Sequence, residues 1–414
     1  MAPRTLRTPA VHNAASMILH PSLADEPTRT AAYPIAQAKL FLAHSAVSPL
    51  PRVAMQAAMD WARQAAFEGQ MDDVIFPRIA HARRAAARLM GVGPSEISLL
   101  GPTSLGLSLI AHGLDWAPGD QVLYLPECYP ANVYCWQALA QRGVEPVPIR
   151  PQAYGCVRWD DIAPLITSRT RLLALASCHF LTGYRPDLAY IAAEASARGV
   201  LICLDAIQTL GAFPTQLEKV DFAAADAHKW LLGPGGAGVL YVRADRARQI
   251  RPALLGSFNI DSPRFHAQAD IRFEQGGRRF EPGMINIPGV EAMAASMNLL
   301  ADVGTEQTAA AIGRLHALAR ELLSPLGFEW LLPRLGVDPA DSQALSGILS
   351  LLHPEVDLAR LEPALLAAGL VVTIRHLHDG RPVLRIAPHF YNTPDELQRA
   401  ARILHDALAQ ERSA

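Results

Sequence analysis

The stretch "ADAHKWLLGPGGAGVLYV", residues 225–242, places a lysine among apolar residues and glycines. The whole chain has only three lysines, Lys39, Lys219 and Lys229, while arginine supplies the other 34 of its 37 basic residues. A plain surface charge in this protein would therefore usually be an arginine. Burial of a lysine ammonium is costly unless its pKa falls or it forms a covalent bond, and the neutral amine is the nucleophile that makes Schiff bases with carbonyl cofactors. The alternative is that Lys229 extends to solvent beside Trp230.

The glycines that follow this lysine, Gly233, Gly235 and Gly238, formally match the GxGxxG pattern of dinucleotide-binding proteins. That pattern follows a strand and opens a helix, whereas "AGVLYV" (237–242) continues as a strand. We therefore expect a glycine-rich turn that allows close backbone approach.

An acidic residue precedes Lys229 by 24 positions, in "VLICLDAIQTLGAFP" (200–214). Five apolar residues predict a strand, Asp205 stands where that strand ends, and Gln208 follows. An acid at this position could pair with the protonated pyridine nitrogen of pyridoxal phosphate (PLP), which needs that proton to act as an electron sink. The alternative is a helix N-cap, which explains Asp205 alone but not the lysine after it.

Hydroxyl residues open a helical pattern further upstream, in "LLGPTSLGLSLIAHGL" (99–114). Thr103 and Ser104, with the free backbone N–H groups of a helix start, form a typical phosphate site. A simple Ser/Thr cap is the alternative for this motif taken alone. A phosphate site, an acid and a lysine at successive strand ends are together much harder to explain by chance.

Short apolar runs alternate with helical patterns between about residues 95 and 245. The predicted strands are 121–125, 144–149, 171–175, 200–204 and 237–242. This alternation is typical of an α/β fold with a mainly parallel sheet covered on both faces, whose ligands bind at the carboxyl ends of the strands. After about residue 300 the pattern changes to that of a smaller α+β domain. We predict an N-terminal arm (1–34), a large domain (35–300) and a small C-terminal domain (301–414).

The composition excludes several classes of partner. A net charge of −2 over 414 residues leaves no basic footprint for nucleic acid or an anionic membrane, and no apolar run approaches the ~20 residues of a membrane span. The five cysteines, an odd number, have no zinc-ligand spacing, so we expect reduced thiols and no metal site. The first thirty residues lack an apolar signal segment, which favours a loose arm and a cytoplasmic protein.

Most of the chain resembles the class V aminotransferase family of PLP enzymes (fold type I), which includes cysteine desulfurases and kynureninases. Besides the motifs above, the resemblance rests on "FLAHSAVSPLP" (41–51), "ECYPANVYCW" (127–136), "FLTGYRPDL" (180–188), "FEPGMINIPG" (280–289) and "LRIAPHFYNTPDEL" (384–397). It implies a sheet of the seven-stranded type in the large domain and pyridoxal 5'-phosphate as the cofactor.

The resemblance also implies roles around the cofactor ring. Lys229 would be the Schiff-base lysine and Asp205 the partner of the pyridine nitrogen, which makes these two the catalytic residues. Gln208 would hydrogen-bond the phenolic oxygen, and Tyr129 would stack on the ring. His179 stands where relatives have Asn or Gln near the cofactor; its alternative is a histidine whose hydrogen bonds are satisfied in the wall of the site.

By the same resemblance, Thr103, Ser104 and His228 would hold the cofactor phosphate.

Arg385 matches the arginine that clamps the substrate α-carboxylate by a bidentate contact. We also place His44 and Ser45 at the substrate. Met284 replaces a hydroxyl residue that usually reaches the partner subunit's phosphate. The loop 374–385 has no cysteine, and desulfurases need a thiol there to accept sulfur.

These features predict a homodimeric PLP enzyme acting on a small α-amino acid, most simply an aminotransferase. The alternatives are a C–S or C–C lyase of the kynureninase type, an epimerase, a cysteine desulfurase, or a PLP-binding regulator without turnover. The complete set of Asp205, Gln208, Lys229 and Arg385 argues against the regulator.

Overall fold

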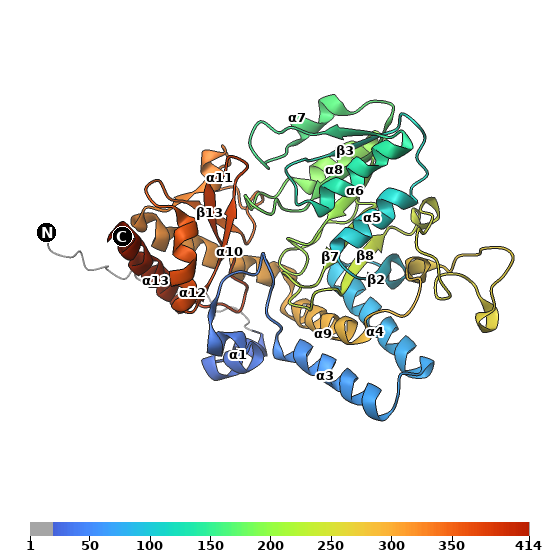
Figure 1. Ribbon diagram of the computed structural model, residues 1–414, viewed down its shortest axis with the longest axis horizontal. Helices are drawn as coiled ribbons and strands as arrows, with labels where there is room; N and C mark the ends of the chain where they lie inside the picture. The colour runs from blue at the N-terminus through green and yellow to red at the C-terminus, as the bar shows by residue number, and fades with distance from the viewer. Residues whose placement is uncertain (1–19, 414) are drawn as a thin grey trace.

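The computed structural model describes residues 20–413, and Figure 1 shows a large domain beside a smaller one formed mainly by the C-terminal quarter of the chain. The large domain is built on a seven-stranded sheet in the order β2-β8-β7-β6-β5-β3-β4. Its strands are β2 (Ile97–Leu100), β3 (Gln121–Tyr124), β4 (Glu145–Pro148), β5 (Thr170–Ala176), β6 (Leu201–Asp205), β7 (Phe222–Asp226) and β8 (Gly238–Val242).

All neighbouring strands of this sheet are parallel except β8, which runs antiparallel to both β2 and β7. The expectation of a mainly parallel α/β sheet is confirmed, as is the continuation of the glycine-rich turn into strand β8. The strands β2 and β7 were not predicted. The sequence of β7, "FAAAD", favours a helix by composition, and only its burial between β6 and β8 makes it a strand.

Helices cover both faces of the large sheet because successive strand residues point to opposite sides. Leu173 and Leu175 of β5 pack with the core that includes helices α4, α8 and α9, while Leu172 and Ala174 pack with α5 and α6. The helices of this domain are α3 (Arg52–Phe67), α4 (Asp72–Met90), α5 (Thr103–Gly113), α6 (Ala131–Gln137), α7 (Trp159–Ile162), α8 (Leu188–Ala197) and α9 (Ile287–Val303).

The small domain has a four-stranded antiparallel sheet in the order β12-β13-β10-β9. Its strands are β9 (Glu329–Trp330), β10 (Leu349–Leu352), β11 (Leu370–Val371), β12 (Thr373–His376) and β13 (Pro382–Ile386), of which β11 lies outside this sheet. Its helices are α10 (Thr305–Leu323), α11 (Leu331–Arg334), α12 (Glu362–Ala367) and α13 (Pro394–Ser413). The smaller α+β domain expected from the sequence is confirmed.

The N-terminal segment joins the small domain, unlike the loose arm and the boundary at residue 35 that we expected. Helices α1 (Glu26–Ala32) and α2 (Ile35–Ala38) precede β1 (Leu40–Phe41), which pairs in parallel with β11. Arg29 of α1 forms an ion pair with Glu396 of α13, with 3.0 Å between Nη1 and Oε1. Residues 1–19, the first part of the predicted arm, lie outside the described range.

Candidate active site

A cavity of about 320 Å³ lies at the carboxyl ends of β6 and β7, where the large domain meets the small one. Residues 45–47 reach it because the backbone N–H of Ser48 donates to the carbonyl of His228, at 2.7 Å. Nine of the predicted site residues line this cavity: Ser45, Thr103, Ser104, Tyr129, Asp205, Gln208, His228, Lys229 and Arg385. The predicted residues His44 and His179 do not line it.

Lys229 lies in the turn after β7 and is 8% exposed. Burial lowers the pKa of its ammonium to about 8, and the opposing effects of Asp205, which raises that pKa, and Arg385, which lowers it further, are smaller. Lys229 Nζ lies 5.4 Å from the centroid of the half-exposed Tyr129 ring. A substantial fraction of the amine is therefore neutral near pH 8 and faces a cavity, as a nucleophilic lysine requires.

Asp205 is the last residue of β6, so the strand direction aims its carboxylate at the cavity. Burial raises its pKa, while a hydrogen bond to Oδ1 from the Ile207 N–H (3.1 Å) and the charge of Lys229 lower it. Among the described residues no arginine or lysine forms an ion pair with it, which leaves this buried carboxylate free to pair with a cationic group in the cavity.

Gln208 is held by two neighbours. Its Nε2 donates to the Ser45 carbonyl (3.2 Å), and its Oε1 accepts from the indole N–H of Trp230 (2.9 Å). Sequence analysis did not assign a role to Trp230, which is fully buried and fixes the amide so that Gln208 retains one free N–H. The buried Ser45 hydroxyl has no hydrogen-bond partner among the described residues.

The first turn of α5 supplies the third side of the cavity. No side chain caps this helix, because its N-cap residue is Pro102. Thr103 Oγ1 accepts from the N–H of Asp226 at 2.9 Å, and His228 Nδ1 lies 3.1 Å from Asp226 Oδ1. The uncapped N–H groups and the hydroxyl of Ser104 fit an anion such as a phosphate.

Arg385, on β13 of the small domain, is 2% exposed, and one of its guanidinium N–H groups donates to the Phe180 carbonyl. Its Nε has no partner among the described residues. Burial, and to a smaller extent the charge of the neighbouring Arg375, lowers the pKa of Arg385 to about 9. Arg375, which sequence analysis left without a role, also lines the cavity.

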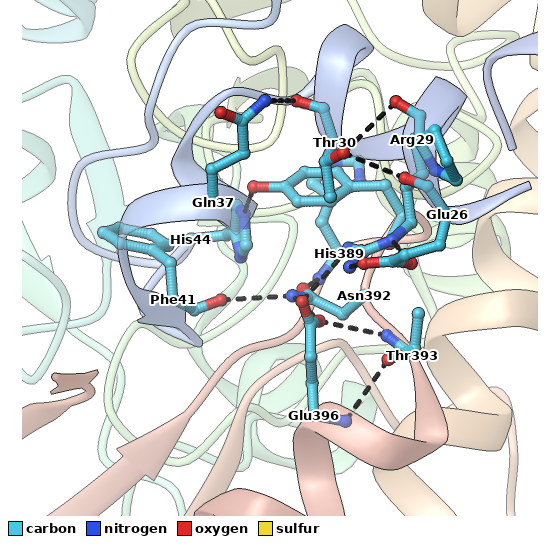
Figure 2. A network of polar contacts seen from close by, with 12 residues as sticks. Glu26, Arg29, Thr30, Gln37, Phe41, His44, His389, Asn392, Thr393 and Glu396 are labelled. Atoms are coloured by element: carbon cyan, nitrogen blue, oxygen red, sulfur yellow. Dashed lines mark hydrogen bonds and ion pairs between the residues drawn. The ribbon is translucent and has the colours of Figure 1, made fainter. Parts of the chain in front are cut away.

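Neither His179 nor His44 lines the cavity, and the ring nitrogens of both have hydrogen-bond partners; for His179 this fits the alternative of a satisfied histidine in the wall of the site. His179 Nε2 donates to the Glu127 carbonyl (2.9 Å), and its ring packs so closely on Gly155 that a Cβ there would lie 2.5 Å from the ring. His44 donates from Nδ1 to the Ala387 carbonyl (2.8 Å) and accepts at Nε2 from the hydroxyl of Tyr391 (2.7 Å). Figure 2 shows His44 among residues of the N-terminal segment and the small domain.

The sequence profile of the aminotransferase class-V family matches residues 40–399. This chain belongs to that family. Its cofactor is pyridoxal phosphate.

Several characterised and uncharacterised relatives align with most of this chain. It is 27% identical over 371 residues to an uncharacterised aminotransferase of Bacillus subtilis, covering 89% of this chain and 94% of that protein. It is 28% identical to isopenicillin N epimerase of Streptomyces clavuligerus (88% and 93% covered) and 28% identical to a probable cysteine desulfurase of Aeropyrum pernix (80% and 84%). These relatives differ in activity, so family membership leaves the reaction open.

Solved structures show the same fold. The apo cysteine desulfurase of Thermococcus onnurineus superposes with a TM-score of 0.84 at 21% identity, covering 96% of this chain and all of that one. A cystine C–S lyase in complex with cysteine persulfide superposes with a TM-score of 0.78 at 23% identity, covering 90% and 99%.

The residues of the cavity fit the family's cofactor. The unpaired Asp205 carboxylate, the free hydroxyl of Ser45 and the uncapped start of α5 are buried or partly buried polar groups that a phosphorylated pyridine would satisfy. Lys229 opens on the same space with a lowered pKa. Among the described residues there is no group of three or more side chains suited to hold a metal, and no helix is long and apolar enough to cross a membrane.

Proposed function

We propose that this protein is an aminotransferase that acts on a small α-amino acid. One observation carries the proposal: a single cavity joins an amine of lowered pKa (Lys229), a buried unpaired carboxylate (Asp205) and a buried guanidinium (Arg385), and its lining contains no thiol. The aminotransferase relative, which the chain covers almost completely, supports it.

In this proposal the cofactor, when bound, supplies an electron sink for the negative charge at the substrate's α-carbon. Asp205 would keep the ring nitrogen protonated, and Gln208 would donate its free N–H to the ring's phenolic oxygen. Thr103, Ser104 and His228 would hold the phosphate, and Tyr129 would stack on the ring.

Lys229 is the group that moves the proton. Its neutral Nζ would take the proton from the substrate's α-carbon and, as the ammonium, would hold that proton for delivery to the bound cofactor, which is the single-base proton transfer that transamination needs. A pKa near 8 suits both halves of this task, because the amine is readily deprotonated and reprotonated near neutral pH.

Arg385 binds the substrate α-carboxylate. Burial strengthens an interaction between a guanidinium and a carboxylate, and the planar fork orients the substrate by two parallel hydrogen bonds. The unpartnered Nε is available for one of them.

Cysteine desulfuration is disfavoured by the placement of the thiols. The five cysteines are all buried, and burial raises the pKa of each. Sulfur transfer to a protein thiol requires an accessible thiolate. The loop between β12 and β13, which has no cysteine, therefore offers no acceptor.

The proposal is tested by incubating the PLP-loaded protein with a panel of L- and D-amino acids. Formation of the pyridoxamine cofactor with one equivalent of keto acid supports transamination. Pyruvate with ammonia indicates a lyase, inversion of the α-carbon an epimerase, and sulfide a desulfurase. A regulator without turnover would leave every amino acid unchanged.

We also propose that the protein is a homodimer. Helix α3 carries the exposed apolar side chains of Val53, Met55, Met59 and Phe67, of which Phe67 is 84% exposed. Met71, which follows the loop after this helix, is exposed as well. Exposed apolar groups gathered on one helix mark an interaction surface. Light scattering on the eluting protein gives the mass, and a monomer at micromolar concentration would contradict this proposal.

A further inference from the structure

Two guanidinium groups stand side by side at the small-domain wall of the cavity. Arg375 lies on β12 and Arg385 on β13, with Thr373 directly opposite Arg385 in the antiparallel register. Residues two apart on a strand share a face, so Arg375 and Arg385 are diagonal neighbours on one face of the sheet. Both line the cavity.

No acidic side chain neutralises this pair. Among the described residues neither arginine has a carboxylate within ion-pair distance, and the hydrogen bonds that they donate go to the backbone carbonyls of Ile374 and Phe180. Of the two carboxylates in the cavity lining, Asp226 lies against His228, and Asp205, at the end of β6, forms no ion pair with either arginine. Like charges on adjacent strands are destabilising, so an anionic ligand is the missing partner.

An amino acid with one carboxylate satisfies only one of these cations. We propose that the substrate is an α-amino acid with a second anionic group, a dicarboxylic amino acid of the size of aspartate or glutamate. Its α-carboxylate binds Arg385 and its side-chain carboxylate binds Arg375. This inference rests on the proposed function and adds to it the substrate class and a specificity-determining residue.

The position of Arg375 fits such a role. Arg385 is almost fully buried, whereas Arg375 is exposed at the rim, so a substrate that enters the cavity meets Arg375 first. The phosphate of the cofactor is already provided for by the start of α5, on the large domain. Arg375 is therefore available to the substrate. Because its guanidinium is exposed, it contributes more to the attraction and selection of acidic ligands than to the strength of their binding.

The first experiment compares isosteric substrates. We expect kcat/KM for aspartate or glutamate to exceed that for asparagine or glutamine at least about tenfold, because the amide cannot pair with Arg375. In Arg375→Gln this ratio should fall to near one, through a higher KM for the acidic substrate. Arg381→Gln is the matched control, since Arg381 lies in the same hairpin, pairs with Asp379 and does not line the cavity.

A second measurement does not depend on turnover. Calorimetry on the PLP-loaded protein should show succinate binding at least about tenfold tighter than butyrate, with the difference lost in Arg375→Gln and kept in Arg381→Gln. Equal binding of the two acids would overturn the inference. So would loss of PLP affinity in Arg375→Gln, which would assign Arg375 to the cofactor phosphate.

The two proposals fail separately. If neutral amino acids form keto acid as fast as acidic ones, the dicarboxylate inference is wrong and the aminotransferase stands. If succinate binds selectively but no amino acid yields the pyridoxamine form, the recognition of dicarboxylates stands and the aminotransferase is wrong.

Discussion

The charge on Lys229 is balanced by its neighbours. Burial favours the neutral amine, and Asp205 partly restores the ammonium, which brings the pKa of Lys229 to about 8. Asp205 and Arg385 therefore each affect the pKa of Lys229 in addition to the contact proposed for them with the cofactor or the substrate. Removal of Asp205 should lower this pKa further, and removal of Arg385 should raise it.

The attachment of PLP should follow this titration. The neutral amine is the reactive form, so the rate at which cofactor-free protein forms the Schiff base should rise with pH up to about 8 and then level off. The matched reference, PLP with N-acetyl-lysine, should keep rising toward about pH 10.4. Stopped-flow absorbance measures both rates. Borohydride reduction followed by peptide mapping should find the adduct on Lys229, and an adduct on Lys39 or Lys219 would refute the assignment.

Arg385→Lys tests the bidentate contact. The substitution keeps the positive charge but loses the planar fork, so we expect kcat/KM for α-amino acids to fall at least ~10-fold, about 1.4 kcal/mol, with PLP binding unchanged. Kinetics and melting temperature are measured on the same preparation. A lower melting temperature with unchanged kinetics would mean that Arg385 serves the small-domain sheet and not the substrate.

Asp205→Asn tests the partner of the pyridine nitrogen. A neutral amide cannot keep that nitrogen protonated, so turnover should drop on the order of 10³-fold while PLP still binds. Single-turnover absorbance measures this, and near-normal turnover would remove Asp205 from the role.

Which site residues were predictable depended on their place in the fold. Asp205 ends the predicted strand β6, at the edge of the sheet where ligands of parallel strands bind. Lys229 follows β7, a strand that was missed, so its place beside Asp205 rested on the sequence motif and the family resemblance. The positions of His44 and His179 could not be predicted, because a histidine whose hydrogen bonds are satisfied is distinguished only by its tertiary partners. Arg375 could have been found from its spacing in a hairpin with Arg385.

At the scale of elements, the junction between β7 and β8 depends on close backbone approach. A Cβ at Gly238 would lie 2.6 Å from the Ala225 carbonyl oxygen and 2.8 Å from that of Gly101. Neither oxygen belongs to a flexible side chain, so both strands would have to shift. This turn carries Lys229, and its geometry therefore sets the position of the nucleophile.

Gly238→Ala should destabilise the protein by about 1–3 kcal/mol, the usual cost of overpacking. Urea denaturation measures the free energy of unfolding. The control is Gly313→Ala, on an exposed position of α10 where nothing lies within 4 Å, and this change should stabilise the protein by up to about 1 kcal/mol because alanine is the better helix former. Equal effects of the two substitutions would mean that the approach at Gly238 is not tight.

Strands and helices were predicted correctly where the apolar pattern of the sequence was clear, and they were missed where burial in the folded protein determined the secondary structure. The strands β3, β4, β5, β6 and β8 were predicted within a few residues. β7 was missed because alanine-rich segments favour helices, and only a central place in a sheet overrides that preference. The helical, docked state of residues 20–38 had no apolar periodicity to reveal it.

At the scale of the whole molecule, a buried ion pair joins helix α1 to helix α13. Arg29 and Glu396 are both almost fully buried, and Glu396 also accepts from the Asn392 side chain at 2.8 Å (Figure 2). The ring of Tyr33 stacks on Tyr391 with 4.2 Å between centroids. Helix α1 and Tyr33 are therefore anchored to α13 and to the segment just before it.

Arg29→Met should lower the free energy of unfolding by about 2 kcal/mol, because it strands a buried carboxylate. The control, Arg88→Met, removes an exposed pair with Asp302 and should cost less than about 1 kcal/mol. Denaturation followed by fluorescence measures both. Equal losses would show that the pair contributes no more than a surface contact.

The attachment of β1 to the small domain has a consequence for the order in which the molecule assembles on the ribosome. His44 hydrogen-bonds to Ala387, which is 343 positions further along the chain. At ~5–20 residues per second, this partner leaves the ribosome roughly 20–70 s after the first strand. The large domain can form its sheet during that wait, since all seven of its strands end by Val242. Residues 40–44 must stay unpaired until their partners in the small domain have been synthesised, so the cavity closes only after the large-domain sheet can form.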